Sequence, residues 1–267
     1  MSDISIVFFS CLALGCLVGF LAGLLGIGGG LIIVPVLSYL LLALDLVPNE
    51  QAMLVAIATS LASIIFTSSS SAFAHHRNQN IPWHIAPWVL VGVSVGALLS
   101  GVIATGISND TLQLIFASCV IFIAIRMILP HQPKEQSALP HGSILTLGTS
   151  VIGAISGMVG IGGGALLVPF LTYFKLDMRK AIGCAALSGI LIATFGVVGY
   201  ISLGLQYHDI NEGFIGYVYL PALIGIVLTS ALFAQLGAKA VQYLPVKIIK
   251  RIFAALLVIV AIRMLSS

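Results

Sequence analysis

Gly26-Ile27-Gly28-Gly29-Gly30, near the start of the chain, recurs as Gly160-Ile161-Gly162-Gly163-Gly164 in its second half. In both copies the glycines follow a long apolar segment and precede a Val-Pro pair, Val34-Pro35 and Val168-Pro169. Glycine weakens a helix and lets the backbone approach a neighbour or a ligand closely. The motif therefore predicts a helix that is interrupted at the same point in each half of a duplicated chain.

The duplication extends beyond the glycines. Ala124-Ile125-Arg126-Met127 returns letter for letter as Ala261-Ile262-Arg263-Met264, and the segment 56–63 aligns with the segment 181–188. We expect a first repeat at residues 1–130, a cytoplasmic linker at 131–141 and a second repeat at 142–267.

Composition excludes a water-soluble fold. Hydrophobic residues make up 60% of the chain and charged residues 7%, whereas a soluble domain carries roughly a quarter charged residues. The stretches 4–44 and 142–174 contain no charged side chain, and each is longer than the roughly 20 residues that cross a bilayer once. No basic run suggests nucleic acid as a partner. The sequence predicts an all-α, polytopic integral membrane protein that has the lipid bilayer as its surroundings.

Each half contains five apolar segments, which together give about 8–10 transmembrane segments of the usual length. In the first half they span about 4–25, 31–44, 51–74, 82–107 and 111–129, and in the second about 143–159, 165–174, 179–205, 214–238 and 245–265.

Charge placement predicts how these segments cross the membrane, because cytoplasmic loops are enriched in Lys and Arg. If the two segments around each glycine motif return to the face where they began, Arg263 alone among the basic residues lies outside. If each pair instead forms one broken span, the basic residues divide between both faces. The returning arrangement is therefore favoured, although the sequence leaves open whether the pairs are re-entrant or full spans. With five segments per half it predicts inverted repeats, with both termini outside.

The glycine motifs are the first candidate substrate-binding site. A helix that begins inside the membrane presents free N–H groups and the positive end of its dipole, which suits an anion. The alternative is that the glycines only permit close helix packing. Pro35 and Pro169 are predicted to reinforce the structural break. The candidate substrate-binding glycines are Gly26, Gly28, Gly29, Gly30, Gly160, Gly162, Gly163 and Gly164.

Hydroxyl groups in the third segment of each half are further candidates. Thr59, Ser60 and Ser63, with Ser188 in the second half, are predicted to contact substrate, although serines in membrane helices often bond only to backbone carbonyls. The run 67–71 adds hydroxyls on several faces of the same segment. The cations at 75–77 either complement the end of a helix or gather anions at a cytoplasmic mouth.

Absent features narrow the function. No Asp or Glu lies in the middle of an apolar segment, which argues against a cation pump and favours an anionic or neutral solute. The chain has no H-E-x-x-H or G-x-S-x-G motif, and its four cysteines lack CxxC spacing. We therefore expect no enzyme activity, no catalytic residue, no metal and no cofactor. A structural or assembly membrane protein, and a homo-oligomer, both stay open.

The repeated G-x-G-G-G followed by V-P, in a short membrane protein of this kind, resembles the sulfite exporter TauE/SafE family. The resemblance covers essentially the whole chain. It implies a secondary transporter that exports sulfite or another small organosulfur anion across the bacterial cytoplasmic membrane. In the second half, Cys184-Ala185 stands where the first half has Thr59-Ser60.

Overall fold

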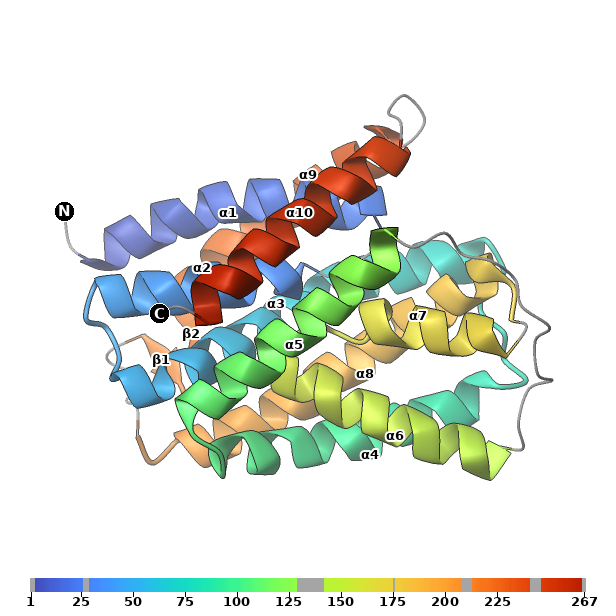
Figure 1. Ribbon diagram of the computed structural model, residues 1–267, viewed down its shortest axis with the longest axis horizontal. Coiled ribbons are helices and arrows are strands. Elements are labelled where there is room, and N and C mark those ends of the chain that lie inside the picture. The colour runs from blue at the N-terminus through green and yellow to red at the C-terminus, as the bar shows by residue number, and fades with distance from the viewer. Residues whose placement is uncertain are drawn as a thin grey trace.

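The computed structural model describes residues 3–25, 29–128, 142–174, 176–207, 213–240 and 246–265. Within these ranges the chain forms ten α-helices and one short hairpin (Figure 1). The helices are α1 (Asp3–Leu25), α2 (Gly30–Ala43), α3 (Asn49–Arg77), α4 (Ala86–Thr105), α5 (Asn109–Ile128), α6 (Gly142–Val159), α7 (Gly164–Tyr173), α8 (Met178–Gly204), α9 (Leu220–Ala240) and α10 (Val246–Leu265).

The hairpin corrects the all-α prediction. Strands β1 (Phe214–Ile215) and β2 (Val218–Tyr219) pair antiparallel where the sequence predicted the start of an apolar helix. Gly213 and Gly216 have φ angles of 84° and 57°, a left-handed conformation that only glycine adopts without strain. These two residues turn the chain, so α9 begins only at Leu220.

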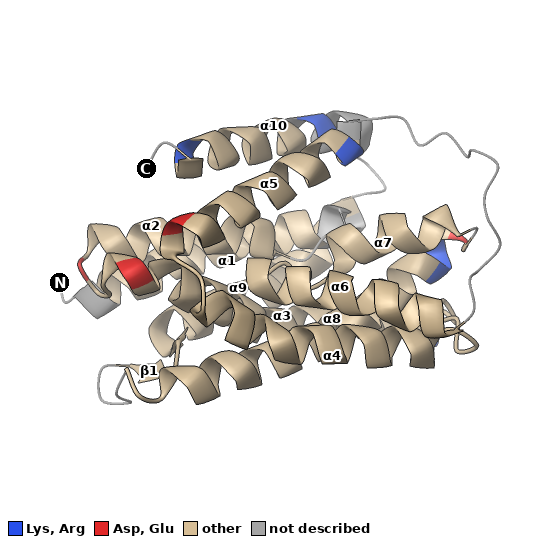
Figure 2. Cartoon of the chain, turned by 60° about the horizontal axis from the view of Figure 1, so that its bottom comes forward, with Lys and Arg blue, Asp and Glu red and all other residues tan. Residues whose placement is uncertain are grey.

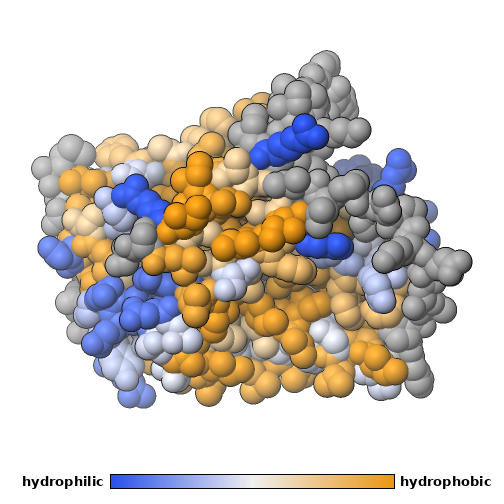
Figure 3. Space-filling view, viewed as in Figure 1, coloured by the Kyte–Doolittle hydropathy of each residue, from blue (hydrophilic) through white to orange (hydrophobic). Residues whose placement is uncertain are grey.

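Seven helices of the described chain are long and apolar enough to cross a membrane. Large apolar side chains cover the middle of the face in Figure 3, with polar residues mostly toward its ends. Leu147 and Leu232, for example, are 71% and 65% exposed. Such a surface is stable in lipid but not in water. The fold is therefore that of a polytopic membrane protein.

Helices α4 and α6 form one of two glycine-lined seams. Gly92 and Gly96 of α4 lie against the backbone of α6, and Gly153 and Gly157 of α6 lie against α4. Residues near the start of the seam in α4 contact residues near its start in α6, and later residues contact later ones. The two helices therefore run parallel. Small residues let helix backbones approach closely, which is how helices associate in lipid without a hydrophobic driving force.

The second seam joins α1 to α9 in the same way. Gly15 and Gly19 of α1 meet the backbone of α9, and Gly225 of α9 meets α1, again in parallel order. The Thr229 hydroxyl donates to the carbonyl of Leu12 at 2.9 Å across this seam. Each seam therefore joins a helix from the first half of the chain to one from the second half.

The centre of the molecule is an antiparallel pair. Gly196 of α8 faces Leu61 of α3, Gly189 faces Ser68, and Gly183 faces the carbonyl of Asn80. These contacts run in opposite order along the two helices. α3 and α8 are the third helices of their halves, so equivalent helices cross one another at the core.

Charged residues lie at helix ends (Figure 2). Arg77 and Arg126 are in the last turns of α3 and α5, and Glu50 and Asp110 are in their first turns. We name the end where α3 and α5 finish the basic end and the other the acidic end. α1 begins and α10 finishes at the acidic end (Figures 1 and 2).

The seams yield a stability prediction. A Cβ at position 96 would overlap the carbonyl of Ser150, whereas a Cβ at Gly106 would meet no atom closer than 3.5 Å. Overpacking of this kind costs about 1–3 kcal/mol. Gly96→Ala is expected to lower the melting temperature of the detergent-purified protein by about 2–10 °C, and Gly106→Ala by under about 2 °C. Equal melting temperatures would show that the α4–α6 seam is not tightly packed.

Candidate functional site

The second glycine motif joins two helices with a backbone that favours glycine. α6 ends at Val159 and α7 begins at Gly164, and Gly160, Gly162 and Gly163 have φ angles of 72°, 73° and 81°. A side chain in this region costs about 1–2 kcal/mol. Gly163 precedes α7, and its carbonyl accepts from Leu167 N at 2.8 Å. The first N–H groups of α7 have no partner within the helix.

The first motif differs in conformation at the equivalent residue. Gly29 precedes α2 with an ordinary helical φ of −64°, and Gly30 is the first residue of α2. Gly26 and Gly28 lie outside the described residues. Two motifs that match in sequence therefore have different backbones where each precedes its helix.

The two motifs contact one another. Gly30 lies against the carbonyl of Gly160 so closely that a Cβ at position 30 would overlap it. The same carbonyl accepts a hydrogen bond from the Ser60 hydroxyl at 2.9 Å. An unpaired carbonyl inside a membrane protein costs several kcal/mol. Ser60 therefore stabilises the second break and ties it to α3.

Pro35 and Pro169 lie inside α2 and α7, and both helices continue through them. A proline cannot donate a backbone hydrogen bond. In the described chain the prolines therefore weaken the first turns of these helices, and the helix boundaries fall at the glycines.

The predicted hydroxyls are packed inside the protein. Thr59, Ser60 and Ser188 are fully buried and Ser63 is 1% exposed. The Thr59 hydroxyl accepts from the backbone N–H of Tyr219 at 3.0 Å, and the Ser63 hydroxyl donates to the carbonyl of Ser60 at 2.7 Å. In this conformation Thr59, Ser60 and Ser63 bond to the protein.

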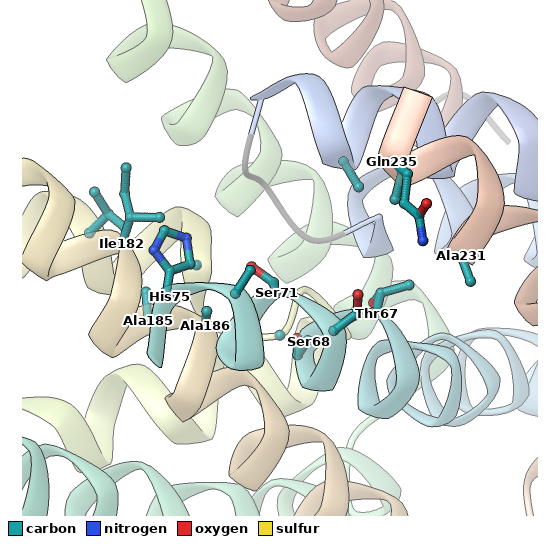
Figure 4. A pocket seen from close by; sticks show the side chains of 16 residues that line it. Thr67, Ser68, Ser71, His75, Ile182, Ala185, Ala186, Ala231 and Gln235 are labelled. Carbon is teal, nitrogen blue, oxygen red and sulfur yellow. The ribbon is translucent and has the colours of Figure 1, made fainter. Parts of the chain in front are cut away.

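A cavity of about 350 Å³ lies beside the second motif, and different residues line it. Gly162 and Gly164 form part of its wall, and the end of α1 adds Ala22. The labelled side chains in Figure 4 come from α3, α8 and α9. Among the lining residues are the polar side chains Thr67, Ser68, Ser70, Ser71, His75 and Gln235.

The cavity lies one to two turns further along α3 than the hydroxyls that the sequence predicts to contact substrate. The run 67–71 was noted only as hydroxyls on several faces, and the structure shows that Thr67, Ser68, Ser70 and Ser71 all line the cavity. What distinguishes these residues is their place in the fold, because this part of α3 lies beside the second glycine motif. Gln235 gave no signal in the sequence.

Among the described residues that line the cavity, His75 is the one whose side chain can gain or lose a proton near neutral pH. The Asn80 amide nitrogen lies 3.4 Å from its Nδ1. When that amide donates, the neutral ring carries its proton on Nε2, so this second nitrogen can donate to a ligand. No Asp, Glu, Lys or Arg is among the described lining residues. The wall therefore offers neutral hydrogen-bond donors and no carboxylate that would hold a cation.

The hairpin packs against the other part of α3. Tyr219 is 1% exposed, and its ring lies 4.6 Å from that of Phe214, centre to centre. The start of the hairpin turn lies against the end of α8, where Gly204 meets the backbone of Gly216 and Tyr217. The cavity thus lies along the part of α3 that leads to the basic end, and aromatic side chains fill the space toward the acidic end.

Comparison with known proteins identifies the family. The family model described as "Sulfite exporter TauE/SafE" matches residues 11–264. The chain belongs to the sulfite exporter TauE/SafE family. It is 41% identical to a "Probable membrane transporter protein" of Haemophilus influenzae, over 95% of this chain and 96% of that protein.

More distant relatives carry similar names. The chain is 26% identical to "Probable membrane transporter protein MJ0441" of Methanocaldococcus jannaschii, over 94% of this chain and 92% of that protein. It is 28% identical to "Probable membrane transporter protein YdhB" of Bacillus subtilis, over 88% and 90%. No solved structure matches the chain. The family is one of membrane transporters, and these relatives are named as probable membrane transporters. Within the described residues no group of three or more His, Cys, Asp or Glu could hold a metal ion.

The different backbones of Gly29 and Gly163 lead to a testable difference. Gly163→Ala places a side chain at a φ of 81°, whereas Gly29→Ala keeps an allowed φ. Each new Cβ would overlap one aliphatic side chain, Ile192 for position 163 and Val18 for position 29, so the backbone conformation makes the difference. Gly163→Ala is expected to cost about 1–2 kcal/mol more. Thermal unfolding of both purified variants checks this, and an equal loss of stability in the two would contradict the asymmetry.

Proposed function

We propose that the chain is a secondary transporter that exports a small sulfur-containing anion, sulfite or an organosulfonate, across the cytoplasmic membrane. The cavity beside the second glycine motif carries the proposal, because Gly162 and Gly164 bring the start of α7 into its wall. The family name supplies the sulfur-containing substrate class.

The chemistry of the wall favours an anion over a cation. The start of α7 offers backbone N–H groups and a positive dipole end, and Ser68 and Ser71 add hydroxyl donors. A sulfite or sulfonate group accepts several such hydrogen bonds at once. Because the described lining holds no Lys or Arg, binding relies on neutral donors and stays weak enough for release, as a transporter requires.

The helix packing supports inverted repeats, and hence alternating access, as part of this proposal. Exchanging the two halves turns the α1–α9 seam into the α6–α4 seam, and both seams are parallel. The equivalent helices α3 and α8 cross antiparallel. This is the arrangement expected for halves of opposite orientation, with the substrate site near the membrane midplane where they meet. The two termini then lie together on the outer face.

The seams also decide which parts move. The sequence alone suggests that the first half rocks against the second, but α1 is packed to α9 and α4 to α6. In each seam the glycines lie against backbone atoms of the partner helix. The two helices of a seam therefore have little room to slide past one another. The moving bodies we propose are therefore mixed pairs, one helix from each half.

A flux measurement tests the function. Purified protein in proteoliposomes is expected to release radiolabelled sulfite or a sulfonate several-fold faster than protein-free liposomes, and a pH gradient shows whether protons are coupled. Sulfate and thiosulfate serve as competing anions, and a neutral amino acid and sodium serve as solutes of the other classes. Flux of the neutral solute or of sodium alone, or of none of them, would overturn the proposal.

A cavity-filling variant tests the site. Ser71 lines the cavity, so Ser71→Trp is expected to reduce anion flux about tenfold or more, since the indole excludes ligand and water from the pathway. The matched control is Phe73→Trp on the same helix, because Phe73 is 65% exposed on the outer surface. This control is expected to keep wild-type flux. Equal flux in the two variants, both folded, would place the pathway elsewhere.

A further inference from the structure

The duplicated sequence gives each residue of the cavity a counterpart in the other half. The glycine motifs pair Gly164 with Gly30 and, one helix earlier, Ala22 with Ser156. The aligned segments 181–188 and 56–63 pair Ala185 with Ser60, and continue to pair Ser71 with Gly196 and His75 with Tyr200. Pro221 and Pro87 align α9 with α4 and pair Ala234 with Ser100. We call Gly30, Ser60, Ser100, Ser156, Gly196 and Tyr200 the counterpart cluster.

Members of the counterpart cluster meet one another in the structure, although they come from five helices. A Cβ at Gly30 would meet the Ser60 hydroxyl at 3.0 Å, and a Cβ at Gly196 would lie 3.8 Å from the Ser100 hydroxyl. The Tyr200 hydroxyl donates at 3.3 Å to the carbonyl of Gly157, which itself lies against Ser100. These contacts form two sets, Gly30 with Ser60 and Gly196 and Tyr200 with Ser100, and Ser156 directly precedes Gly157 in α6.

The counterpart cluster is closed in this conformation. Ser60, Ser100, Ser156 and Tyr200 are each 0% exposed, whereas Ser71 and Gln235 in the cavity are exposed. Of the other paired cavity residues, Ala185 is buried and Ala22, Gly164, His75 and Ala234 are half-buried, so the cavity side is the more accessible of the two. Inverted repeats that alternate between two states produce such a difference, because the second state exchanges the conformations of the halves.

Ser156 is the member of the counterpart cluster that fits a permanently dry core least. Four of the sixteen counterparts of the lining residues carry hydroxyl groups, and Ser156 stands where the cavity has Ala22. The Ser156 hydroxyl is buried with no hydrogen-bond partner among the described residues. A buried polar group left unpaired costs free energy, and contact with water or a ligand in another conformation would recover it.

We propose that the counterpart cluster is the closed half of the transport site, which opens toward the acidic end and there binds the same small oxyanion through the hydroxyl groups of Ser156 and Tyr200. The proposal rests on the proposed function. In the open state these hydroxyls donate to the anion, together with the N–H groups at the start of α2. The hairpin, whose Tyr219 N–H bonds to Thr59, must then move away from α3.

Site-directed labelling tests this proposal. Ser156→Cys and Ser71→Cys are made in the full chain, embedded in membrane vesicles and exposed to a charged, membrane-impermeant maleimide from one face at a time. Peptide mass spectrometry reads each site separately, so the four native cysteines do not interfere. Ser71→Cys is expected to react from the face of the basic end and Ser156→Cys from the face of the acidic end.

The control is Ser230→Cys. Ser230 is also buried without a hydrogen-bond partner, but it lies on the α1–α9 seam beside Gly19. Ser230→Cys is expected to react with the maleimide about tenfold more slowly than Ser156→Cys, because the α1–α9 seam stays packed in both transport conformations. Gly196→Cys provides a second reporter in the counterpart cluster if Ser156→Cys does not fold, because a Cβ at position 196 would closely meet only the end of the Leu61 side chain.

The outcomes separate this inference from the proposed function. If both reporters in the counterpart cluster react no faster than Ser230→Cys while the vesicles transport sulfite, the inference is wrong and the function stands. If the reporters react from the expected face but none of the tested anions is transported, the function is wrong and the cluster opens for another solute. Reaction of Ser156→Cys from the face of the basic end would also overturn the inference.

Discussion

The need to pair every backbone group away from water governs this structure. Three glycines at positive φ interrupt the second half, and the buried carbonyl of Gly160 accepts a hydrogen bond from the Ser60 hydroxyl. In hydrocarbon such a carbonyl would be very costly without a partner. α3 must therefore pass directly beside the second motif, and the same helix then continues along the cavity. One hydrogen bond thus connects the interrupted helix, the central helix pair and the polar wall of the cavity.

The sequence predicted the broad architecture because the physics involved is local or compositional. Apolar segments, charge-free stretches and the low charge content are sufficient for a polytopic helical membrane protein, and the family resemblance is confirmed. The hairpin at 214–219 was missed because its residues are as apolar as those of the helix that follows. Only two glycines at positive φ distinguish it.

The cavity could not be predicted residue by residue. α3 carries hydroxyls along much of its length, and sequence alone does not say which of them meet Gly160, which meet the hairpin and which face open space. Thr59, Ser60 and Ser63 were chosen for their alignment with the second half, yet here they bond to the protein. Their role as substrate contacts stays a prediction, and Ser60 now has a place in the counterpart cluster. Gly26 and Gly28 fall outside the described residues.

The parallel seams also constrain how the chain assembles. Membrane helices are inserted in order as the chain is synthesised, but α1 finds its glycine-matched partner only when α9 has been made. Until then Gly15 and Gly19 expose bare backbone on a helix that lacks its main packing partner. The first half is thus an unfinished structure while the second is being translated. α1 is made first and its partner α9 almost last, so α1 is without this partner for most of translation. Truncation of the chain before α9 would leave α1 without its main contact.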